Sequence, residues 1–212
     1  FHPLPLFYRA LGGLFQKRGN ASLALACYRE AARVNPADAL SPFLLGRLLL
    51  LQGDVEAATA SFREALRARP DYAEAHNNLG VALYEQGQLT EAADCYRMAL
   101  RLQPGYAAAY NNLGNVELSR GQAAEAEASF RQALRRDTGY AEAHNNLGTA
   151  LKEQGRYQEA EQSLREALRL KPGFAGAMSN LGGALLSQGK PEEAVTAYRE
   201  ALRLQPDLGE AH

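Results

Sequence analysis

The sequence has little of what active sites, metal centres and membrane spans are made from. Its 212 residues include two cysteines, four histidines and no tryptophan, with a formal net charge of −1. No apolar run approaches the roughly 20 residues that span a bilayer, and no secretory signal peptide is visible at Phe1–Leu6. The sequence shows no glycine-rich phosphate loop after a strand, no Ser-His-Asp set and no carboxylate pair that would flank a pocket. We therefore expect a cytoplasmic, non-catalytic chain that binds no cofactor, no nucleic acid and no membrane.

The feature that the sequence does contain is an internal repeat with a constant period. Two glycine columns recur in all six copies: Gly12, Gly46, Gly80, Gly114, Gly148 and Gly182, and then Gly19, Gly53, Gly87, Gly121, Gly155 and Gly189. A column of aromatic residues or leucine follows: Tyr28, Phe62, Tyr96, Phe130, Leu164 and Tyr198. A fixed period of about 34 residues, within the range of about 20–50, indicates a repeat architecture in which each copy buries its apolar face against its neighbours.

Each repeat is predicted to form two helices. In the third copy, Leu79 and Leu83 are one helical turn apart. Asp71 and Glu74 resemble a capping box for a helix that begins at about residue 73. Gly87 is expected to end that helix because glycine adopts the left-handed conformation without a steric penalty. The second helix is predicted over residues 89–103, before Pro104.

These positions resemble the tetratricopeptide repeat (TPR) family over nearly the whole chain. In the third copy the matching residues are Asn78, Leu79, Gly80, Gly87, Ala92, Tyr96, Ala99 and Pro104. The resemblance implies an all-α solenoid of six antiparallel helix pairs, stacked into a right-handed superhelix whose first helices line a concave groove. The expected organisation is a flank at 1–4, repeats at 5–38, 39–72, 73–106, 107–140, 141–174 and 175–208, and a truncated seventh at 209–212. Because the chain does not begin with methionine, we expect it to be a fragment or a processed product.

The cysteines and histidines fall in columns that separate them. Cys27 and Cys95 are two repeats apart, or roughly 20 Å at about 10 Å per packed helix, whereas a disulfide needs Cα atoms within about 7 Å. His76, His144 and His212 share another column at the same two-repeat spacing. Zinc ligands must lie within about 2.3 Å of one ion. We therefore predict no disulfide and no metal site, with these histidines as fillers near the start of the first helices.

Each predicted second helix carries two arginines, one helical turn apart, and these recur in every repeat as two columns, here called the arginine ladders. They are Arg29, Arg63, Arg97, Arg131, Arg165 and Arg199, and then Arg33, Arg67, Arg101, Arg135, Arg169 and Arg203. Such ladders could form a basic stripe for nucleic acid. The interpretation favoured here is a solvated outer face, because glutamates such as Glu30 and Glu64 accompany the first ladder and no aromatic stacking residues interleave with it.

Asparagines provide the main candidate site. One column holds Asn78, Asn112, Asn146 and Asn180, and the column before it holds Asn77, Asn111 and Asn145; Asn115 lies one turn further along its helix. The TPR resemblance implies that the column of Asn78 faces the groove. A carboxamide both donates and accepts hydrogen bonds, so it can pair with any peptide backbone. These eight residues are predicted to bind an extended polypeptide; the alternative is that they join neighbouring helices.

The asparagine columns, with Ala-His-Asn-Asn-Leu-Gly at 75–80 and 143–148, also resemble the repeats of O-GlcNAc transferases. That resemblance implies a second possibility, in which the chain recruits substrates for a longer glycosyltransferase whose catalytic domain is absent here. The carboxylate-clamp mode of the family is not expected. Its groove cations are replaced by Val81, Asn115, Thr149 and Gly183, with Lys152 as an isolated cation.

Three departures from the pattern lead to further expectations. Ser41 and Pro42 are predicted to cap and open a late helix, and the leucines at 44–51 suggest that this helix is covered by another element. Glu117 replaces an apolar residue, which indicates either a specificity feature or an adjusted register. Near the end, Tyr198, Ala201 and Leu202 should be partly bare because no capping helix follows. We therefore expect self-association through this face or through the leucine-rich helix.

Overall fold

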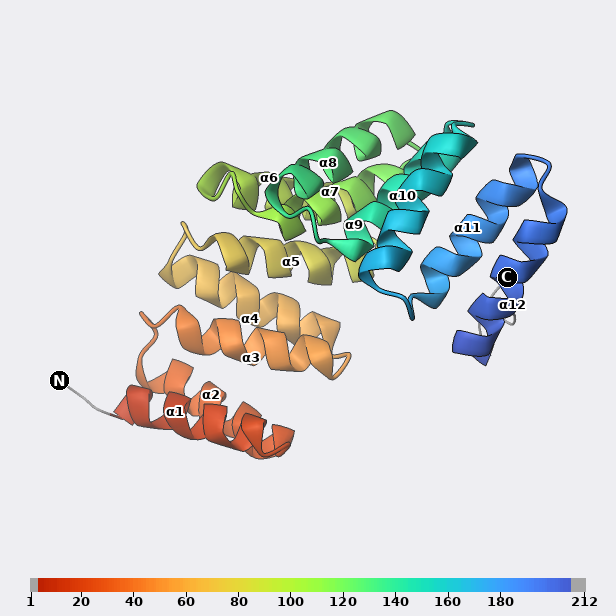
Figure 1. Ribbon diagram of the computed structural model, residues 1–212. Helices are drawn as coiled ribbons and strands as arrows, with labels where there is room; N and C mark the ends of the chain where they lie inside the picture. Colours follow the sequence, from red (N-terminus) through yellow and green to blue (C-terminus); the bar gives the residue numbers. More distant parts are fainter. Residues whose placement is uncertain (1–3, 207–212) are drawn as a thin grey trace. The chain divides into compact units, whose positions relative to one another are not determined.

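The computed structural model describes residues 4–206, which contain twelve α-helices and no strand (Figure 1). This confirms the all-α prediction. The chain divides into two compact units, Phe1–Pro104 (unit 1) and Gly105–His212 (unit 2), each of which holds three helix pairs. None of the described helices is long and apolar enough to cross a membrane.

Unit 1 contains α1 (Leu4–Lys17), α2 (Ala21–Val34), α3 (Leu40–Leu51), α4 (Val55–Ala68), α5 (Ala73–Glu85) and α6 (Leu89–Leu102). Helices pack in pairs within each repeat, and α3 and α5 each also pack on the second helix of the preceding repeat. Their apolar faces meet between the helices, with Tyr28, Phe62 and Tyr96 almost fully buried.

Unit 2 contains α7 (Ala107–Ser119), α8 (Ala123–Arg136), α9 (Ala141–Glu153), α10 (Tyr157–Leu170), α11 (Ala175–Ser187) and α12 (Pro191–Leu204). The first helices of successive repeats are in contact, α7 with α9 and α9 with α11. A continuous core runs from Phe130 through Leu151 and Leu164 to Leu185. The side chains on α7, α9 and α11 that point away from this core therefore form one face.

The second glycine column ends the first helices, as predicted. All six of its members have a positive φ, in the left-handed region that glycine adopts without strain. In the third repeat, the Gly87 amide donates to the Tyr84 carbonyl at 2.9 Å and the Gln88 amide donates to the Leu83 carbonyl at 2.9 Å. The chain can therefore reverse direction within a short turn and begin the second helix.

The first glycine column permits close helix contact, a role that the sequence analysis did not assign. A Cβ atom added at Gly114 would lie 2.6 Å from the Phe130 ring, and one at Gly148 would lie 2.5 Å from Leu164. Real Cβ atoms do not approach neighbours this closely. The glycine and the large residue of the aromatic column in the same repeat are therefore a matched pair, and they set the separation of the two helices.

Two predicted helix caps are wrong. Tyr72, not Asp71, is the N-cap of α5, and it makes no side-chain capping bond. Its ring is buried against Phe43 at 4.7 Å between centroids, with the Arg69 guanidinium 3.3 Å from the ring centre. Packing of an aromatic residue therefore positions this helix start.

The second error concerns α3, which begins at Leu40, before Ser41. Asp38 accepts a hydrogen bond from the Leu40 amide at 3.1 Å and another from the Ser41 hydroxyl, so the aspartate organises this helix start. Pro42 does lie in the first turn, as predicted, because its missing amide hydrogen is not needed there.

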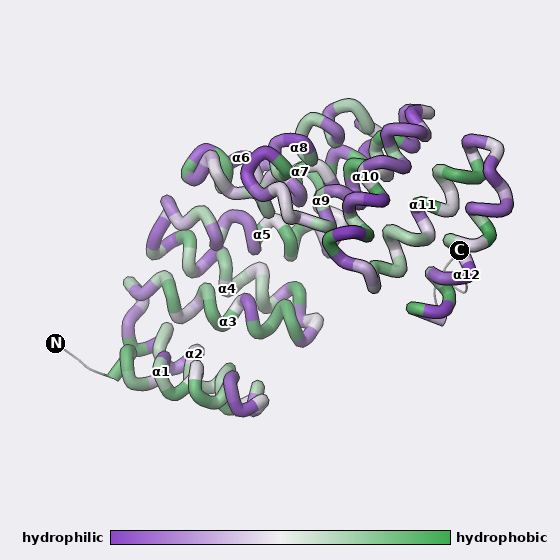
Figure 2. Tube along the Cα trace, viewed as in Figure 1, coloured by the Kyte–Doolittle hydropathy of each residue, from purple (hydrophilic) through white to green (hydrophobic). Residues whose placement is uncertain are grey.

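The leucine-rich helix α3 is covered within its own unit. Figure 2 shows hydrophobic residues along α3, and Leu45, Leu48 and Leu49 are buried against its neighbours. Leu51 is 76% exposed at the end of the helix. The prediction that other elements cover this helix is confirmed. The apolar surface that we expected it to offer for self-association is limited to its last turn.

Glu117 occupies its apolar column without any change of register. Helices α5, α7 and α9 begin at Ala73, Ala107 and Ala141, which keeps the constant period of the repeat. The Ser129 hydroxyl donates to Glu117 Oε2 at 2.6 Å, which stabilises the carboxylate in its half-buried position. The predicted register adjustment is therefore wrong.

Candidate functional site

The asparagine face of unit 2 is formed by polar positions on its three first helices. Spacings of three residues place these side chains on one side of each helix. The residues are Asn112 and Asn115 on α7, Asn146 and Thr149 on α9, and Asn180 and Gly183 on α11. All of them are half-buried.

Asparagines of successive repeats are hydrogen-bonded to each other across this face. Asn146 Nδ2 donates to Asn111 Oδ1 and to Asn115 Oδ1, both at 3.0 Å. One repeat later, Asn180 Nδ2 donates to Asn145 Oδ1 at 2.9 Å. The second asparagine of one repeat thus binds the first asparagine of the repeat before it. This connection explains why the two residues recur together.

The structure therefore divides the eight predicted binding residues into two groups. Asn77 and Asn111 are only 6% and 5% exposed, so they lie below the surface. Asn111, Asn145 and Asn146 join helices, which was the alternative interpretation of these columns. Asn78 donates to the Glu74 carbonyl of its own helix at 2.8 Å.

Two asparagines keep hydrogen-bonding capacity on the face. Asn115 uses its Oδ1 to accept from Asn146, and its Nδ2 has no acceptor among the described residues. Asn180 uses one hydrogen of Nδ2, which leaves its second hydrogen and its Oδ1 available. Between them, the Thr149 hydroxyl donates to the Asn145 carbonyl at 3.3 Å and can still accept. The face therefore offers a donor on α7, an acceptor on α9, and both on α11.

The arginine ladders form ion pairs with acidic residues of the second helices. In the first ladder, Arg63 pairs with Glu91 and Arg165 with Glu193, each one repeat further on and at 3.6 Å. In the second, four arginines pair with the glutamate three residues earlier: Arg33, Arg67, Arg169 and Arg203. These contacts favour the interpretation of a solvated outer face whose charge is largely compensated.

A glutamine at the end of a first helix connects it to the repeat before, a signal that the sequence analysis missed. Gln154 Nε2 donates to the Ala123 carbonyl at 3.1 Å and to Glu127 at 2.8 Å, and Gln188 Nε2 bonds to Glu161 at 2.9 Å. Recurrence of Gln86, Gln154 and Gln188 at the period of the repeat could have identified it.

The two glutamates that accept these bonds stay ionised inside the packed helices. Burial raises the pKa of Glu161, but hydrogen bonds from Gln188, Lys190 and Arg165 outweigh burial and bring the pKa to about 2. Burial also raises the pKa of Glu127, and bonds from Gln154 and Arg156 outweigh it, so this pKa too is lowered. These carboxylates therefore contribute to the stacking of one repeat on the next.

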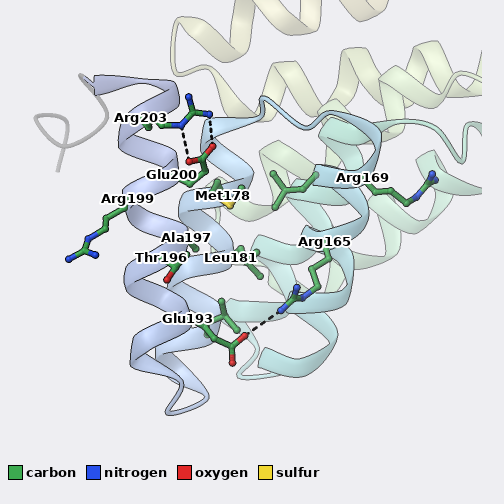
Figure 3. Close-up of a pocket in the computed structure, with 12 residues that line it drawn as sticks. Arg165, Arg169, Met178, Leu181, Glu193, Thr196, Ala197, Arg199, Glu200 and Arg203 are labelled. Carbon is green, nitrogen blue, oxygen red and sulfur yellow. Dashed lines mark hydrogen bonds and ion pairs between the residues drawn. The ribbon is translucent and has the colours of Figure 1, made fainter.

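A hollow of about 930 Å³ is lined by residues of α10, α11 and α12, none of which belongs to the asparagine face. Leu168, Met178 and Leu181 contribute apolar surface to it, and arginines and glutamates surround it (Figure 3). In the view, Arg165 pairs with Glu193 and Arg203 with Glu200. Unit 1 has a similar hollow of about 800 Å³ between α2 and α4. Neither hollow is apparent from the repeat pattern of the sequence.

The cysteines and histidines of the repeat columns lie at structural positions. Cys27 and Cys95 are free, and burial raises the pKa of both thiols. His76 Nε2 is 2.9 Å from the Pro70 carbonyl and His144 Nε2 is 3.3 Å from the Thr138 carbonyl, so both serve near the start of a first helix. Within residues 4–206, no three potential ligands cluster to hold a metal ion. His212 lies outside the described residues.

Comparison with known families and structures agrees with this architecture. The family model of the cilia and flagella-associated protein 70 C-terminal domain, a TPR domain, matches residues 6–212. The chain belongs to this family. A search of curated proteins finds no match.

Solved structures similar to this TPR chain include three other proteins. YrrB, a TPR protein described as having an unusual peptide-binding site, is 25% identical over 86% of this chain and 94% of its own, with a TM-score of 0.66. MamA is also 25% identical, over 78% of this chain and 97% of its own, with the same TM-score. PilF of Pseudomonas aeruginosa is 23% identical over 98% of this chain and 94% of its own, with a TM-score of 0.83, and shows the fold alone.

Proposed function

We propose that this TPR chain is a binding module for extended polypeptides, and that the asparagine face of unit 2 contacts the ligand backbone. The observation that carries the proposal is the remaining hydrogen-bonding capacity of Asn115 and Asn180 on this face. A carboxamide can accept from a backbone N–H and donate to a backbone carbonyl without regard to the ligand side chains.

The spacing of the helices supports an extended ligand. Packed helices lie about 8–10 Å apart, and an extended chain advances about 3.3 Å per residue. About three ligand residues therefore separate equivalent positions on α7, α9 and α11. Each helix can then contact one peptide group of the ligand, about every third residue.

The proposed roles of the eight asparagines differ. Asn115 and Asn180 are assigned to the ligand, together with Asn112, which shares the column of Asn180. Asn78 belongs to unit 1 and bonds to its own helix, so it is not part of this face. Asn77, Asn111, Asn145 and Asn146 are assigned to the stacking of repeats, in keeping with their burial and mutual hydrogen bonds. The peptide-binding description of YrrB, a protein with the same fold, is consistent with such a module.

Fluorescence anisotropy with a neutral peptide pool tests the proposal. The probe is a labelled pool of 12-residue peptides made from Gly, Ser, Thr, Ala, Val and Gln, acetylated and amidated at the ends. Replacement of both Asn115 and Asn180 by alanine removes two backbone contacts, so we expect binding to weaken about tenfold. Thr196→Ala, at the hollow on α12 and outside the asparagine face, is the control and should bind like the original chain.

Circular dichroism of each variant separates loss of binding from loss of folding. If the Asn115→Ala/Asn180→Ala chain keeps its helicity and still binds the pool with unchanged affinity, this face is not the peptide site. Recruitment of substrates for a glycosyltransferase remains the alternative prediction. It requires a nucleotide-sugar-binding domain in the same gene, which sequencing beyond residue 212 checks.

A further inference from the structure

Lys152 differs from the other lysines of unit 2 in having no acidic partner among the described residues. Lys171 pairs with Glu142 at 2.8 Å and Lys190 with Glu161 at 3.0 Å. Lys152 is half-buried near the end of α9, where the described part of the chain offers its ammonium group neither a carboxylate nor a hydrogen-bond acceptor. It lies one helical turn beyond Thr149, next to the asparagine face but outside the residues that define it.

The ammonium group of Lys152 lies beside Gly183 on the neighbouring helix α11. A Cβ atom added at Gly183 would be 3.6 Å from Lys152 Nζ and 3.4 Å from the Tyr198 hydroxyl. Two hydrogen-bond donors from α9 and α12 therefore approach one point, and the missing side chain of Gly183 keeps that point open. Asn180 lies one turn before Gly183 on the same helix.

The Tyr198 hydroxyl lacks the acceptor that the equivalent tyrosine has in the first repeat. There, Tyr28 donates to Gln16 at 2.9 Å. The position equivalent to Gln16 in the sixth repeat holds Leu186, whose side chain cannot accept a hydrogen bond. Between residues 4 and 206, no acceptor is hydrogen-bonded to Tyr198.

We propose that Lys152 and Tyr198 together bind a carboxylate of the polypeptide ligand above Gly183. A carboxylate has two oxygens that accept hydrogen bonds, and a charged donor makes such a bond stronger than a neutral one. This inference rests on the proposed peptide-binding function and adds a preference for an acidic group at one position. The group is either an Asp or Glu side chain or a free C-terminal carboxylate.

Three versions of the peptide pool distinguish these sources. The first is the neutral pool with both ends blocked, the second carries one Glu at its centre, and the third has a free C-terminal carboxylate. We expect the second or the third to bind about tenfold more tightly than the first. Whichever pool gains affinity identifies the source of the carboxylate.

Single substitutions assign that gain to this site. Lys152→Met and Tyr198→Phe each remove one donor while keeping most of the packing, and they should abolish most of the gain for the acidic pool. They should leave binding of the blocked neutral pool unchanged. Lys17→Met, which makes the same charge change on an exposed helix end in unit 1, is the control and should keep the full gain.

Gly183→Ala should affect the stability of the fold and the preference for the acidic pool in opposite directions. The added methyl group makes only ordinary contacts, and alanine favours a helix over glycine. The variant should therefore be at least as stable as the original chain. It should still lose the preference for the acidic pool, because the methyl group occupies the position of the ligand oxygen.

The outcomes separate failure of this inference from failure of the proposed function. Equal affinity for all three pools, or a preference that survives Lys152→Met, overturns the carboxylate site while leaving the peptide-binding face intact. If the blocked neutral pool does not bind and the acidic pools do not bind either, the proposed function itself is wrong.

Discussion

Six glycines allow the two helices of each repeat to come together, because any side chain at these positions would collide with the facing residue. The collision is with Phe130 for Gly114 and with Leu164 for Gly148. Other glycines of the first helices are not constrained in this way, and Gly183 has room for a methyl group. The same residue type thus has different roles at neighbouring positions of the repeat.

Alanine substitution separates these two roles. Gly114→Ala forces a methyl group to 2.6 Å from the fully buried Phe130 ring, so we expect the free energy of unfolding to fall by roughly 1–3 kcal/mol. Gly183→Ala, at the next position of the repeat in α11, should instead raise it by up to about 1 kcal/mol. Urea unfolding of both variants measures the difference. Equal effects would contradict the proposed pairing of glycine and aromatic residue.

A second prediction at this scale concerns the asparagine bonds between repeats. Asn146→Ala leaves the buried Asn111 Oδ1 without its donor, which should lower the free energy of unfolding by about 1–3 kcal/mol. Asn78→Ala, in the same column, removes only a bond to its own helix. It should leave the free energy of unfolding nearly unchanged in urea unfolding, because it disturbs no buried contact. Similar losses in the two variants would mean that the asparagine pairs do not stabilise stacking.

Stacking of one helix pair on the next also depends on carboxylates that stay charged among packed helices. In α10, Glu161 receives bonds from Gln188 and Lys190 of the following repeat and from Arg165 of its own helix. A buried charge of this kind is stable only while its partners are present. It therefore ties the packing of α10 against α11 and α12 to pH.

We expect the stability contribution of Glu161 to be lost in acid. Its pKa in the folded chain is about 2, below the value of about 4.3 expected for an unfolded glutamate. The unfolded state binds more protons between these values, so this contribution is complete above about pH 4–5 and disappears as the pH falls towards about 2. Glu161→Gln should lower stability at neutral pH by roughly 1–3 kcal/mol and flatten the pH dependence in that window.

Thermal unfolding monitored from neutral pH down to about pH 2 measures this effect. Glu153→Gln is the matched control, since Glu153 is exposed and forms no ion pair among the described residues. An unchanged pH profile in Glu161→Gln would contradict the role assigned to this carboxylate.

The elements show which parts of the structure a repeat sequence can predict. Helices and turns depend on local residues, so Gly87 and its column correctly located the helix ends. The start of α5 at Ala73 was predicted correctly, but its N-cap was not. Tyr72 holds that position because its ring packs against Phe43, and these two rings are brought together only by the packing of α3 and α5. The asparagine columns identified recurring amides, but their period does not specify that Asn180 pairs with Asn145. Side-chain partners across repeats required the structure.

At the scale of the whole molecule, the period of the repeat continues unbroken through Pro104 and Gly105, yet the chain forms two compact units that meet there in sequence. The predicted repeat boundaries describe the recurrence of residues and do not indicate this division. The asparagine face and the Lys152 site both lie within unit 2. Their proposed functions therefore do not depend on how the two units are arranged.

Exposed apolar residues lead to a prediction of self-association. On α1, Leu6 and Phe7 are 57% and 60% exposed. Of the residues predicted to be bare on α12, Leu202 is exposed but Ala201 is almost fully buried. Exposed apolar surface favours association. We expect light scattering over a hundredfold concentration range to show that the average mass rises with concentration. The double substitution Leu6→Ser/Phe7→Ser should reduce this rise more than Leu202→Ser does. A constant monomer mass for the original chain would contradict this expectation.

The central claim is that an extended polypeptide binds to the face of α7, α9 and α11. Its most direct test is a nuclear magnetic resonance titration of the ¹⁵N-labelled chain with the blocked neutral peptide pool. We predict that the side-chain amide signals of Asn115 and Asn180 and the backbone amide of Gly183 shift, while Thr196 and Arg199, beside the hollow between α10 and α12, do not. Shifts confined to that hollow, or no shifts on the asparagine face at saturating peptide, would contradict the claim.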